Sequence, residues 1–326
     1  MLWRWTTPKH AGHHAATGEA VGTAFLAHLR KTGLEMAGPD LADWYYAARD
    51  AAQDRQPLME LAEANPGIAT RLLRLASTAP TGRIPPAHNL TEAFDRLGTG
   101  RVFETAAMAL TRKVFLEGEA VSGGELGEFW RHGVAVGILL RCLCEQMEEA
   151  AVLPPGQAFL AGLLHDIGLS AQCRLLGAVR WRMILDGWRG GPGSICELER
   201  EQTGVAHPEI GARLLEYWGI DPEIAGAVAM HHEVAADLGF QQGGLAWLLH
   251  LADWVCVEEE LGFADVGISE AANYSGCQAF LAAAPAELRQ AVASAATELA
   301  WLERLGFVSR LHLRLSFAAA QSPNGG

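Results

Sequence analysis

Histidine and aspartate residues recur in the apolar stretches between residues 132 and 253, and together they suit a metal site. They are His132, the pair His165–Asp166, His207, the pair His231–His232, and Asp253. Burying a polar group without a partner costs roughly 2–7 kcal/mol, and an unpaired charge costs more. A divalent cation removes this cost because it binds deprotonated carboxylates and neutral imidazoles. The pattern therefore predicts one shared metal site.

The spacing of these residues along helices indicates how they would meet. Glu128 lies four residues before His132, so the two side chains share one helix face. His165 and Asp166 are adjacent, so on a helix they point about 100° apart and can face two neighbouring ions. The histidine pair at 231–232 can do the same from another helix. Mixed imidazole and carboxylate ligands favour Fe, Mn or Zn over Mg or Ca.

Other histidines and arginines have more ordinary interpretations. A single histidine on an apolar helix is usually a core residue with one hydrogen bond, so we expect His250 to pack or to cap. We expect the three histidines within residues 10–14 to belong to a solvated N-terminal segment. Arginines cluster near the stretch 187–194 and favour a solvated face. Arg182 and Arg189 are nevertheless the candidates for contact with a phosphate.

Composition limits the classes of protein to consider. The 326 residues are 50% hydrophobic and 19% charged, which is ordinary for a globular chain of one large or two moderate domains. The net charge of −13 argues against broad nucleic-acid binding, which depends on Lys and Arg. No apolar run reaches the length of about 18–20 residues that spans a bilayer, and no signal peptide is evident. Six dispersed cysteines without a CxxC pair suit a reducing cytoplasm.

Helical periodicity dominates the sequence, and it predicts an all-α fold. We expect an N-terminal extension over residues 1–38, a central domain over 39–262 and a C-terminal helical extension over 263–326. The central domain divides into a helical lobe at 39–118 and a metal-binding lobe at 119–262. The expected helices cover residues 40–54, 56–64, 66–76, 89–98, 101–116, 128–149, 195–202, 207–218, 222–233, 243–261 and 284–304, with one more that carries His165.

Local signals fix several helix ends. Asn65 and Asp221 each precede a proline, and both are predicted to cap the helix that follows. The stretch 187–194 is rich in glycine and predicts a flexible loop. If the metal pocket opens to solvent, this loop is our candidate for a movable rim; the alternative is a passive surface connection.

Three ordered segments resemble the HDOD subgroup of the HD superfamily of metal-dependent phosphohydrolases. The first runs from Asn65 to Ala79 (Asn-Pro-Gly-Ile-Ala-Thr-Arg-Leu-Leu-Arg-Leu-Ala-Ser-Thr-Ala) and the second from Asn89 to Gly98. The third runs from Gly204 through His207-Pro-x-x-Gly211 to His231-His232-Glu233. The resemblance covers about residues 40–260, and it implies an HD-type helical bundle with a role in bacterial signal transduction.

The resemblance also implies a ligand set. Relatives that hydrolyse cyclic di-GMP have a glutamate four residues before the first histidine, and Glu128 occupies that place. The implied ligands of a di- or trinuclear centre are Glu128, His132, His165, Asp166, His207, His231, His232 and Asp253. Two features depart from those relatives. Leu169 replaces the lysine that would contact a phosphate, and the Gly-Tyr-Pro motif is missing.

Three functions are compatible with this set, and the sequence leaves open whether the chain is an enzyme. The first is a metal-dependent phosphohydrolase that acts on a phosphorylated small molecule or nucleotide, with ions that activate water and polarise the phosphoryl oxygens. The second is a regulatory scaffold with a structural metal site, whose 40–118 block binds a partner protein in a signalling pathway. The third is an HD-type diiron oxygenase. We favour a cytoplasmic regulatory protein with a divalent transition metal, Fe or Mn before Zn, and no membrane association.

Overall fold

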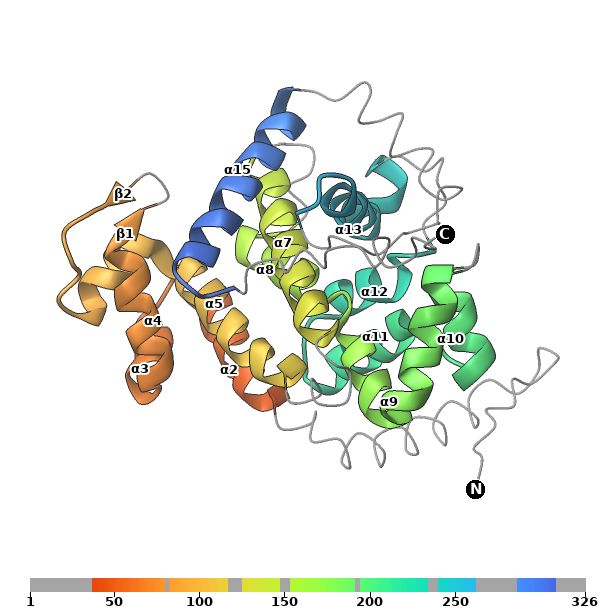
Figure 1. Cartoon of the computed structure of the whole chain (residues 1–326). Coiled ribbons are helices and arrows are strands. Elements are labelled where there is room, and N and C mark those ends of the chain that lie inside the picture. Colours follow the sequence, from red (N-terminus) through yellow and green to blue (C-terminus); the bar gives the residue numbers. More distant parts are fainter. Residues whose placement is uncertain are drawn as a thin grey trace, which may run out of the picture.

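The computed structural model describes residues 37–79, 82–116, 125–146, 153–190, 194–233, 240–261 and 286–308. Their regular structure is almost entirely helical, which confirms the predicted all-α class (Figure 1). Among the described residues, the only strands form a short antiparallel pair, β1 (Thr78–Ala79) and β2 (Gly82–Arg83). Residues 1–36 of the predicted N-terminal extension, and residues 263–285 and 309–326 of the predicted C-terminal extension, lie outside the described residues.

The helices follow the predicted order, with two differences. The helix predicted to carry His165 ends at Leu164, and a kinked helix, α9, covers residues between 167 and 190 for which no helix was predicted. In the first half they are α2 (Ala37–Asp50), α3 (Gln56–Ala64), α4 (Pro66–Ala76), α5 (Leu90–Leu116), α7 (Glu125–Gln146) and α8 (Pro155–Leu164). In the second half they are α9 (Ile167–Gly190), α10 (Ile195–Thr203), α11 (His207–Tyr217), α12 (Pro222–Met230), α13 (Phe240–Glu258) and α15 (Ala286–Arg304). Gly98 has a positive φ of 73° and divides α5 in two, as the sequence predicted.

Both predicted residues occupy the N-cap position before a first-turn proline, but only one of the two side chains makes a cap bond. Asn65 caps α4, because its side chain accepts a hydrogen bond from the backbone N–H of Ile68 at 3.1 Å. The side chain of Asp221 makes no cap bond to α12. It instead accepts a hydrogen bond from the Tyr45 hydroxyl at 2.5 Å, and it lies 3.6 Å from Arg49. Asp221 therefore ties α2 of the predicted helical lobe to the turn between α11 and α12.

The predicted loop at 187–194 is also wrong in its first half. Helix α9 continues to Gly190, and the side chain of Trp188 is only 5% exposed. Packing of this tryptophan outweighs the low helix propensity of the glycines around it. Residues 191–193 lie outside the described part of the chain, and Ser194 caps α10. The expectation of a movable rim therefore has no support at residues 187–190.

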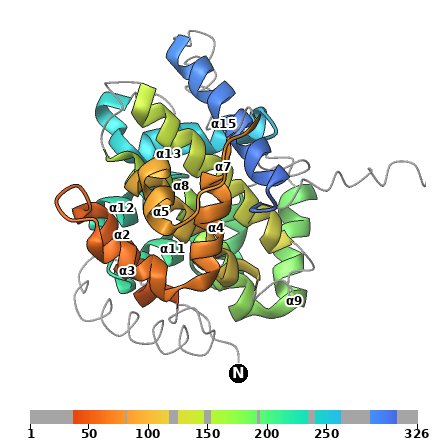
Figure 2. The same cartoon turned by 90° about the vertical axis from the view of Figure 1, so that its left-hand side faces the viewer.

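Helices α7 and α8 form the centre of the molecule, and α2 to α5 lie on one side of them. Figure 2 looks onto this side, with α2, α3, α4 and α5 in front of α7 and α8. A seam of glycines brings α7 and α8 into close contact. A Cβ atom on Gly137 would lie 2.6 Å from the carbonyl oxygen of Phe159, and one on Gly162 would lie 2.6 Å from Gly137 itself. Any larger residue in this seam would force the two helices apart.

A buried network of ion pairs attaches α15 to α5 and α7. Arg141 lies 3.2 Å from Glu104 and 2.6 Å from Glu298, and Arg101 lies 2.9 Å from Glu104 and also pairs with Glu298. Burial raises the pKa of Glu104 despite both arginines. Buried ion pairs of this kind favour one packing of the helices, because any other packing would leave a buried charge without its partner. Helix α15 thus belongs to the packed body of the protein (Figure 1).

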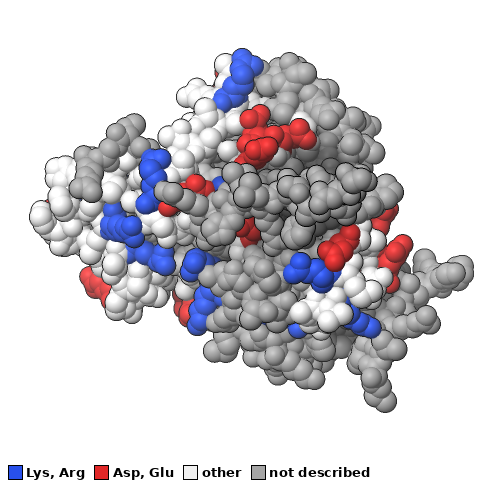
Figure 3. All heavy atoms as spheres, in the orientation of Figure 1, with Lys and Arg blue, Asp and Glu red and all other residues white. Residues whose placement is uncertain are grey.

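The described surface mixes both signs of charge. Figure 3 shows Lys and Arg atoms gathered over the side where α4 and α5 lie, with Asp and Glu atoms more frequent elsewhere on this face. No helix among the described residues has the length and the apolar character needed to cross a membrane.

Candidate metal centre

The predicted ligands converge from five parts of the chain. His132 lies within α7, and Asp253 lies within α13. His165 and Asp166 occupy the turn between α8 and α9, and His207 is the first residue of α11. The pair at 231–232 follows the end of α12. Six of the eight predicted ligands therefore lie at helix ends or on the central helix α7. Asp253, within α13, is the seventh residue that meets them in one buried region.

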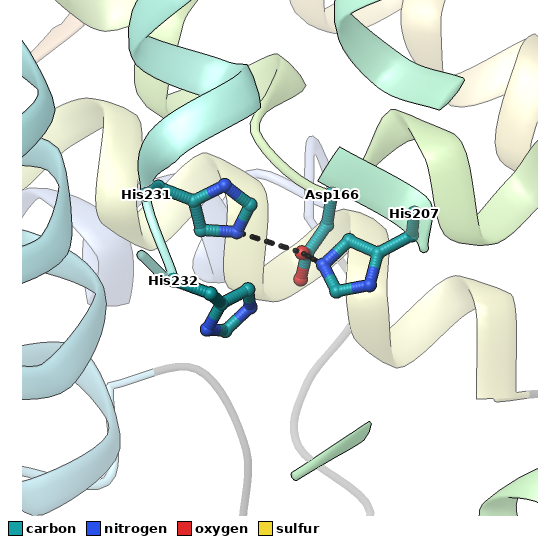
Figure 4. A group of neighbouring side chains, drawn as sticks. All are labelled: Asp166, His207, His231 and His232. Atoms are coloured by element: carbon teal, nitrogen blue, oxygen red, sulfur yellow. Dashed lines mark ion pairs between the residues drawn. The ribbon is translucent and has the colours of Figure 1, made fainter. Parts of the chain in front are cut away.

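These seven residues form two neighbouring groups, in each of which the ligand atoms lie within 4.8 Å of one another. The first group contains His132, His165 and Asp253, and the second contains Asp166, His207, His231 and His232. All are buried except His232, which is partly exposed. Figure 4 shows the second group, in which the Asp166 carboxylate lies between the rings of His231 and His207.

Asp166 connects the two groups. One of its oxygens, Oδ2, lies 3.2 Å from Nε2 of His165, which belongs to the first group. The other, Oδ1, lies 3.2 Å from Nε2 of His207 and 3.7 Å from Nε2 of His231. A carboxylate with one oxygen toward each group has the geometry of a bridge between two cations.

Three histidines present the same nitrogen to the interior. Nδ1 of His165 donates to the carbonyl oxygen of Gly162 at 2.8 Å, and Nδ1 of His231 donates to that of Val228 at 2.7 Å. Nδ1 of His207 is likewise engaged, by a carboxylate at 2.8 Å. Their Nε2 atoms are buried and lack a partner of hydrogen-bond geometry among the described residues. Leaving such an atom unsatisfied costs roughly 1–3 kcal/mol, so the site is built for a further group.

A close helix contact sets the distance between these ligands. Gly168 follows Asp166 by two residues, and a Cβ atom there would lie 2.0 Å from the carbonyl oxygen of His207. Gly211 also lies against Gly168. Only glycine lets α9 and α11 approach this closely, and the approach places Asp166 beside His207.

Two histidines of the centre have raised pKa values. Burial favours the neutral form of His165, but the charge of Asp166 outweighs it and raises the pKa. The charge of Glu199 likewise acts against burial and raises the pKa of His207 well above its usual range. Without a metal, both imidazoles therefore hold a proton more firmly than an ordinary histidine.

The carboxylates and His231 shift the other way. Burial disfavours charged Asp166 and Asp253, but His165 holds the pKa of Asp166 well below its usual range, and a hydrogen bond with His132 lowers that of Asp253. Burial, assisted by the neighbouring histidines, lowers the pKa of His231 to about 3. Anionic carboxylates and a neutral imidazole are the forms that a cation requires.

Three predicted site residues, Glu128, Arg182 and Arg189, are not members of these two groups. Glu128 is partly buried on α7, one turn before His132, and belongs to neither group. Arg182 is exposed on α9. Arg189 lies near the end of α9, but its side chain is outside the described part of the structure. The metal role of Glu128 and the phosphate role of the two arginines therefore stay predictions.

A third group was not predicted from the sequence. It contains Cys196, Glu199 and His207, all buried. Both new residues lie on α10, in the polar stretch Ile-Cys-Glu-Leu-Glu-Arg-Glu-Gln-Thr. A capped amphipathic helix with several glutamates has an ordinary solvated interpretation, so no local signal distinguished Glu199.

The donor set fits a transition metal. The two main groups offer imidazole nitrogens and carboxylate oxygens, which suit Fe, Mn and Zn better than Mg or Ca. The inward Nε2 atoms and the central position of Asp166 would be satisfied by a cation in each group.

Comparisons with known proteins agree with this architecture. The HDOD domain model matches residues 46–234. No curated protein matches the chain. One similar solved structure is an HDOD domain protein with unknown function from Geobacter sulfurreducens, at 18% identity and a TM-score of 0.56, covering 82% of this chain and 89% of that one.

Two further structures come from Shewanella amazonensis SB2B. One is a provisionally named phosphohydrolase at 20% identity and a TM-score of 0.56, covering 82% of this chain and 90% of that one. The other is a provisionally named metal-dependent phosphohydrolase at 16% identity and a TM-score of 0.52, covering 86% of this chain and 99% of that one. At these identities the likeness concerns the fold.

Proposed function

The chain belongs to the HDOD family, and on this premise we propose that it is a regulatory protein of bacterial signal transduction whose His and Asp centre holds two divalent transition-metal ions and hydrolyses a phosphate ester. The observation that carries the proposal is the position of Asp166. Its two oxygens point to His165 on one side and to His207 on the other, each at 3.2 Å. Paired metal ions recur in phosphatases and nucleases, and Asp166 would be available as a ligand to an ion in either group.

The proposed chemistry divides between the ions and the chain. Bound divalent ions would activate a water molecule and polarise the phosphoryl oxygens. The chain orients the imidazoles, because backbone carbonyls hold Nδ1 of His165 and His231 and leave Nε2 toward the interior. His232 is the partly exposed member of its group, so we place substrate entry on its side of the centre.

The proposal assigns no role to a phosphate-binding lysine. Leu169 occupies the place that such a lysine has in the related cyclic di-GMP hydrolases, and its side chain is 1% exposed and packed in the core. Arg182, which is exposed on α9, and Arg189 stay candidates for charge neutralisation. The expected substrate is therefore a phosphate ester other than cyclic di-GMP.

The test begins with anaerobic purification and metal analysis. We expect close to two Fe or Mn ions per chain, and turnover of bis(p-nitrophenyl) phosphate or p-nitrophenyl phosphate by the loaded protein. Asp166→Asn should abolish both. Loaded protein that cleaves neither ester would favour the regulatory scaffold with a structural metal. Oxygen consumption by the reduced-iron protein would favour the oxygenase, and protein that stays metal-free would contradict the proposal as a whole.

A further inference from the structure

The buried carboxylate of Glu199, on α10, contacts His207 twice. Its Oε2 atom accepts hydrogen bonds from the backbone N–H of His207 and from Nδ1 of its ring, both at 2.8 Å. The side chain of Glu199 is 0% exposed. Nε2 of the same ring faces Asp166 at 3.2 Å. The ring of His207 is therefore held between one carboxylate outside the centre and one inside it.

The position of His207 at the start of a helix explains why a side chain is needed there. His165 and His231 follow the helices α8 and α12, so each donates Nδ1–H to a carbonyl oxygen three residues earlier. His207 is the first residue of α11, and the residue three positions before it is Gly204, which ends α10 in a left-handed conformation. His207 thus has no helical carbonyl behind it. Glu199 supplies the acceptor that the two other histidines obtain from their own helices.

The carboxylate of Glu199 differs from a backbone carbonyl acceptor because it can carry a charge. A fully buried carboxylate is costly unless a cationic or strongly polar partner compensates it. The second oxygen of Glu199, Oε1, has no hydrogen-bond partner among the described residues. Both hydrogen bonds that Oε2 accepts come from His207. A ring that donates to a carboxylate is a more basic ligand and is fixed in one tautomer.

Helix α10 is held in place by a cap at its start and by contacts with two neighbouring segments. Ser194 and Glu197 form a capping box at its start. Arg200, next to Glu199, bonds Glu209 of α11 at 2.8 Å and Glu233, which follows the histidine pair, at 2.5 Å. One turn of α10 therefore contacts two of the three segments that supply the second ligand group, those of His207 and of the histidine pair.

We propose that Glu199 is a positioning residue of the metal centre, which orients His207 so that Nε2 faces the ion and which strengthens it as a ligand. The inference rests on the metal site of the proposed function. A competing interpretation is a separate cation held by Cys196, Glu199 and His207, whose ligand atoms also lie within 4.8 Å of one another. The two interpretations differ in the number of ions and in the effect of Cys196.

The test compares metal binding by the wild-type chain, Glu199→Gln and Glu201→Gln. Glutamine keeps the size of the side chain and an accepting oxygen but removes the charge. Glu201 is exposed on the same helix and is the matched control. Metal-free protein is titrated anaerobically with Co²⁺ against a chelator, and the visible spectrum of bound Co²⁺ is recorded. Glu199→Gln should bind about 10- to 100-fold more weakly, with an altered spectrum, because outer-shell partners of ligating histidines have effects of this size. Glu201→Gln should match the wild type.

Further variants separate positioning from other roles. Glu199→Asp keeps the charge but shortens the side chain, so its affinity should lie between those of the wild type and Glu199→Gln; it also serves as the test variant if glutamine prevents folding. Cys196→Ser should keep the number of ions, and the loss of one ion would overturn the proposal in favour of the separate site. Wild-type affinity and spectrum in the folded Glu199 variants would overturn it while leaving the metal centre intact. A wild-type chain that binds no Co²⁺ would overturn the centre and this inference together.

Discussion

Nε2 of His132 lies 2.8 Å from Oδ1 of Asp253, although the two residues are 121 positions apart in the sequence. The contact joins α7 to α13, and both side chains are buried. Each of these atoms is a potential metal ligand, so without metal the ligands act as partners for one another. Metal binding would replace this contact by bonds from the two residues to the ion.

Metal affinity should rise with pH. The pKa values of His165 and His207 are raised, so both rings are protonated at pH values where an ordinary histidine, with a pKa of about 6.5, is largely neutral. An ion needs the neutral ring, so binding must release these protons, and raising the pH favours the bound state. Affinity for Mn²⁺ should therefore still increase between about pH 6.5 and about pH 8. Calorimetry in buffers of different ionisation enthalpy would count the protons, and a flat affinity profile over this interval would contradict the assignment.

Asp166→Asn should have the largest effect of any single carboxylate change. It removes the charge that faces both ligand groups, so we expect a loss of metal affinity greater than about 100-fold, beyond the range of outer-shell changes. Glu128→Gln is the comparison, since Glu128 belongs to neither group. Elemental analysis and chelator competition measure both. An equal loss in Glu128→Gln would show that this carboxylate also ligates, as the family resemblance implies.

Gly168→Ala should disturb the centre without changing a ligand. The new methyl group would lie 2.0 Å from the carbonyl oxygen of His207, so α9 and α11 must separate. We expect a destabilisation of about 1–3 kcal/mol, typical of overpacking, together with weaker metal binding. Gly226→Ala in α12 is the control, because a Cβ atom there has no neighbour within 4 Å. Urea unfolding should find that control unchanged or more stable by up to about 1 kcal/mol.

Glu104→Gln should destabilise the whole chain. Glu104 is 2% exposed and lies within reach of Arg101 and Arg141, so its loss leaves the buried guanidinium group of Arg141 with less compensation. Removing one partner of a buried pair costs roughly 3–5 kcal/mol. Asp95→Asn, which breaks a surface pair with Arg55, should cost about 0–1 kcal/mol. Equal unfolding free energies for the two variants would argue against a structural role for the buried network.

Cyclic di-GMP should not be an efficient substrate. The related hydrolases place a lysine where this chain has Leu169, and the buried side chain of Leu169 offers no charge to a phosphate. Chromatography of reactions with Mn²⁺- or Fe²⁺-loaded protein would detect the linear dinucleotide. Rapid turnover would show that another cation, such as Arg182, fulfils the role of the lysine.

The sequence predicted best those features that depend on local chemistry. Residues 56–64 and 66–76 form helices with the predicted bounds, because Asn65 and Pro66 specify an end and a start within two residues. The meeting of His132 with Asp253 was predicted from a different signal, the presence of costly polar side chains in apolar helices. Such side chains need polar or charged partners, and the apolar helices contain few of these.

Features that depend on tertiary contacts were not predicted. Asp221 has the sequence of a cap, but the hydroxyl of Tyr45 occupies its carboxylate. The stretch 187–190 has the composition of a loop, but Trp188 packs in the core and keeps it helical. Glu199 is one of several glutamates on α10, and only the return of the chain at Gly204 places it against His207. In each case the outcome depends on a contact with another part of the fold, which the local sequence does not reveal.

The glycine seam between α7 and α8 has a consequence for how related chains are classified. One methyl group at Gly137 or Gly162 would separate the helices that carry His132 and lead into His165, while every histidine and aspartate stayed in place. A survey that counts ligand residues would score such a relative as a competent metalloprotein and would be mistaken. Small residues at these positions are therefore the better diagnostic of a working centre, and a natural lineage could silence the site by a single alanine without losing any residue of the familiar motif.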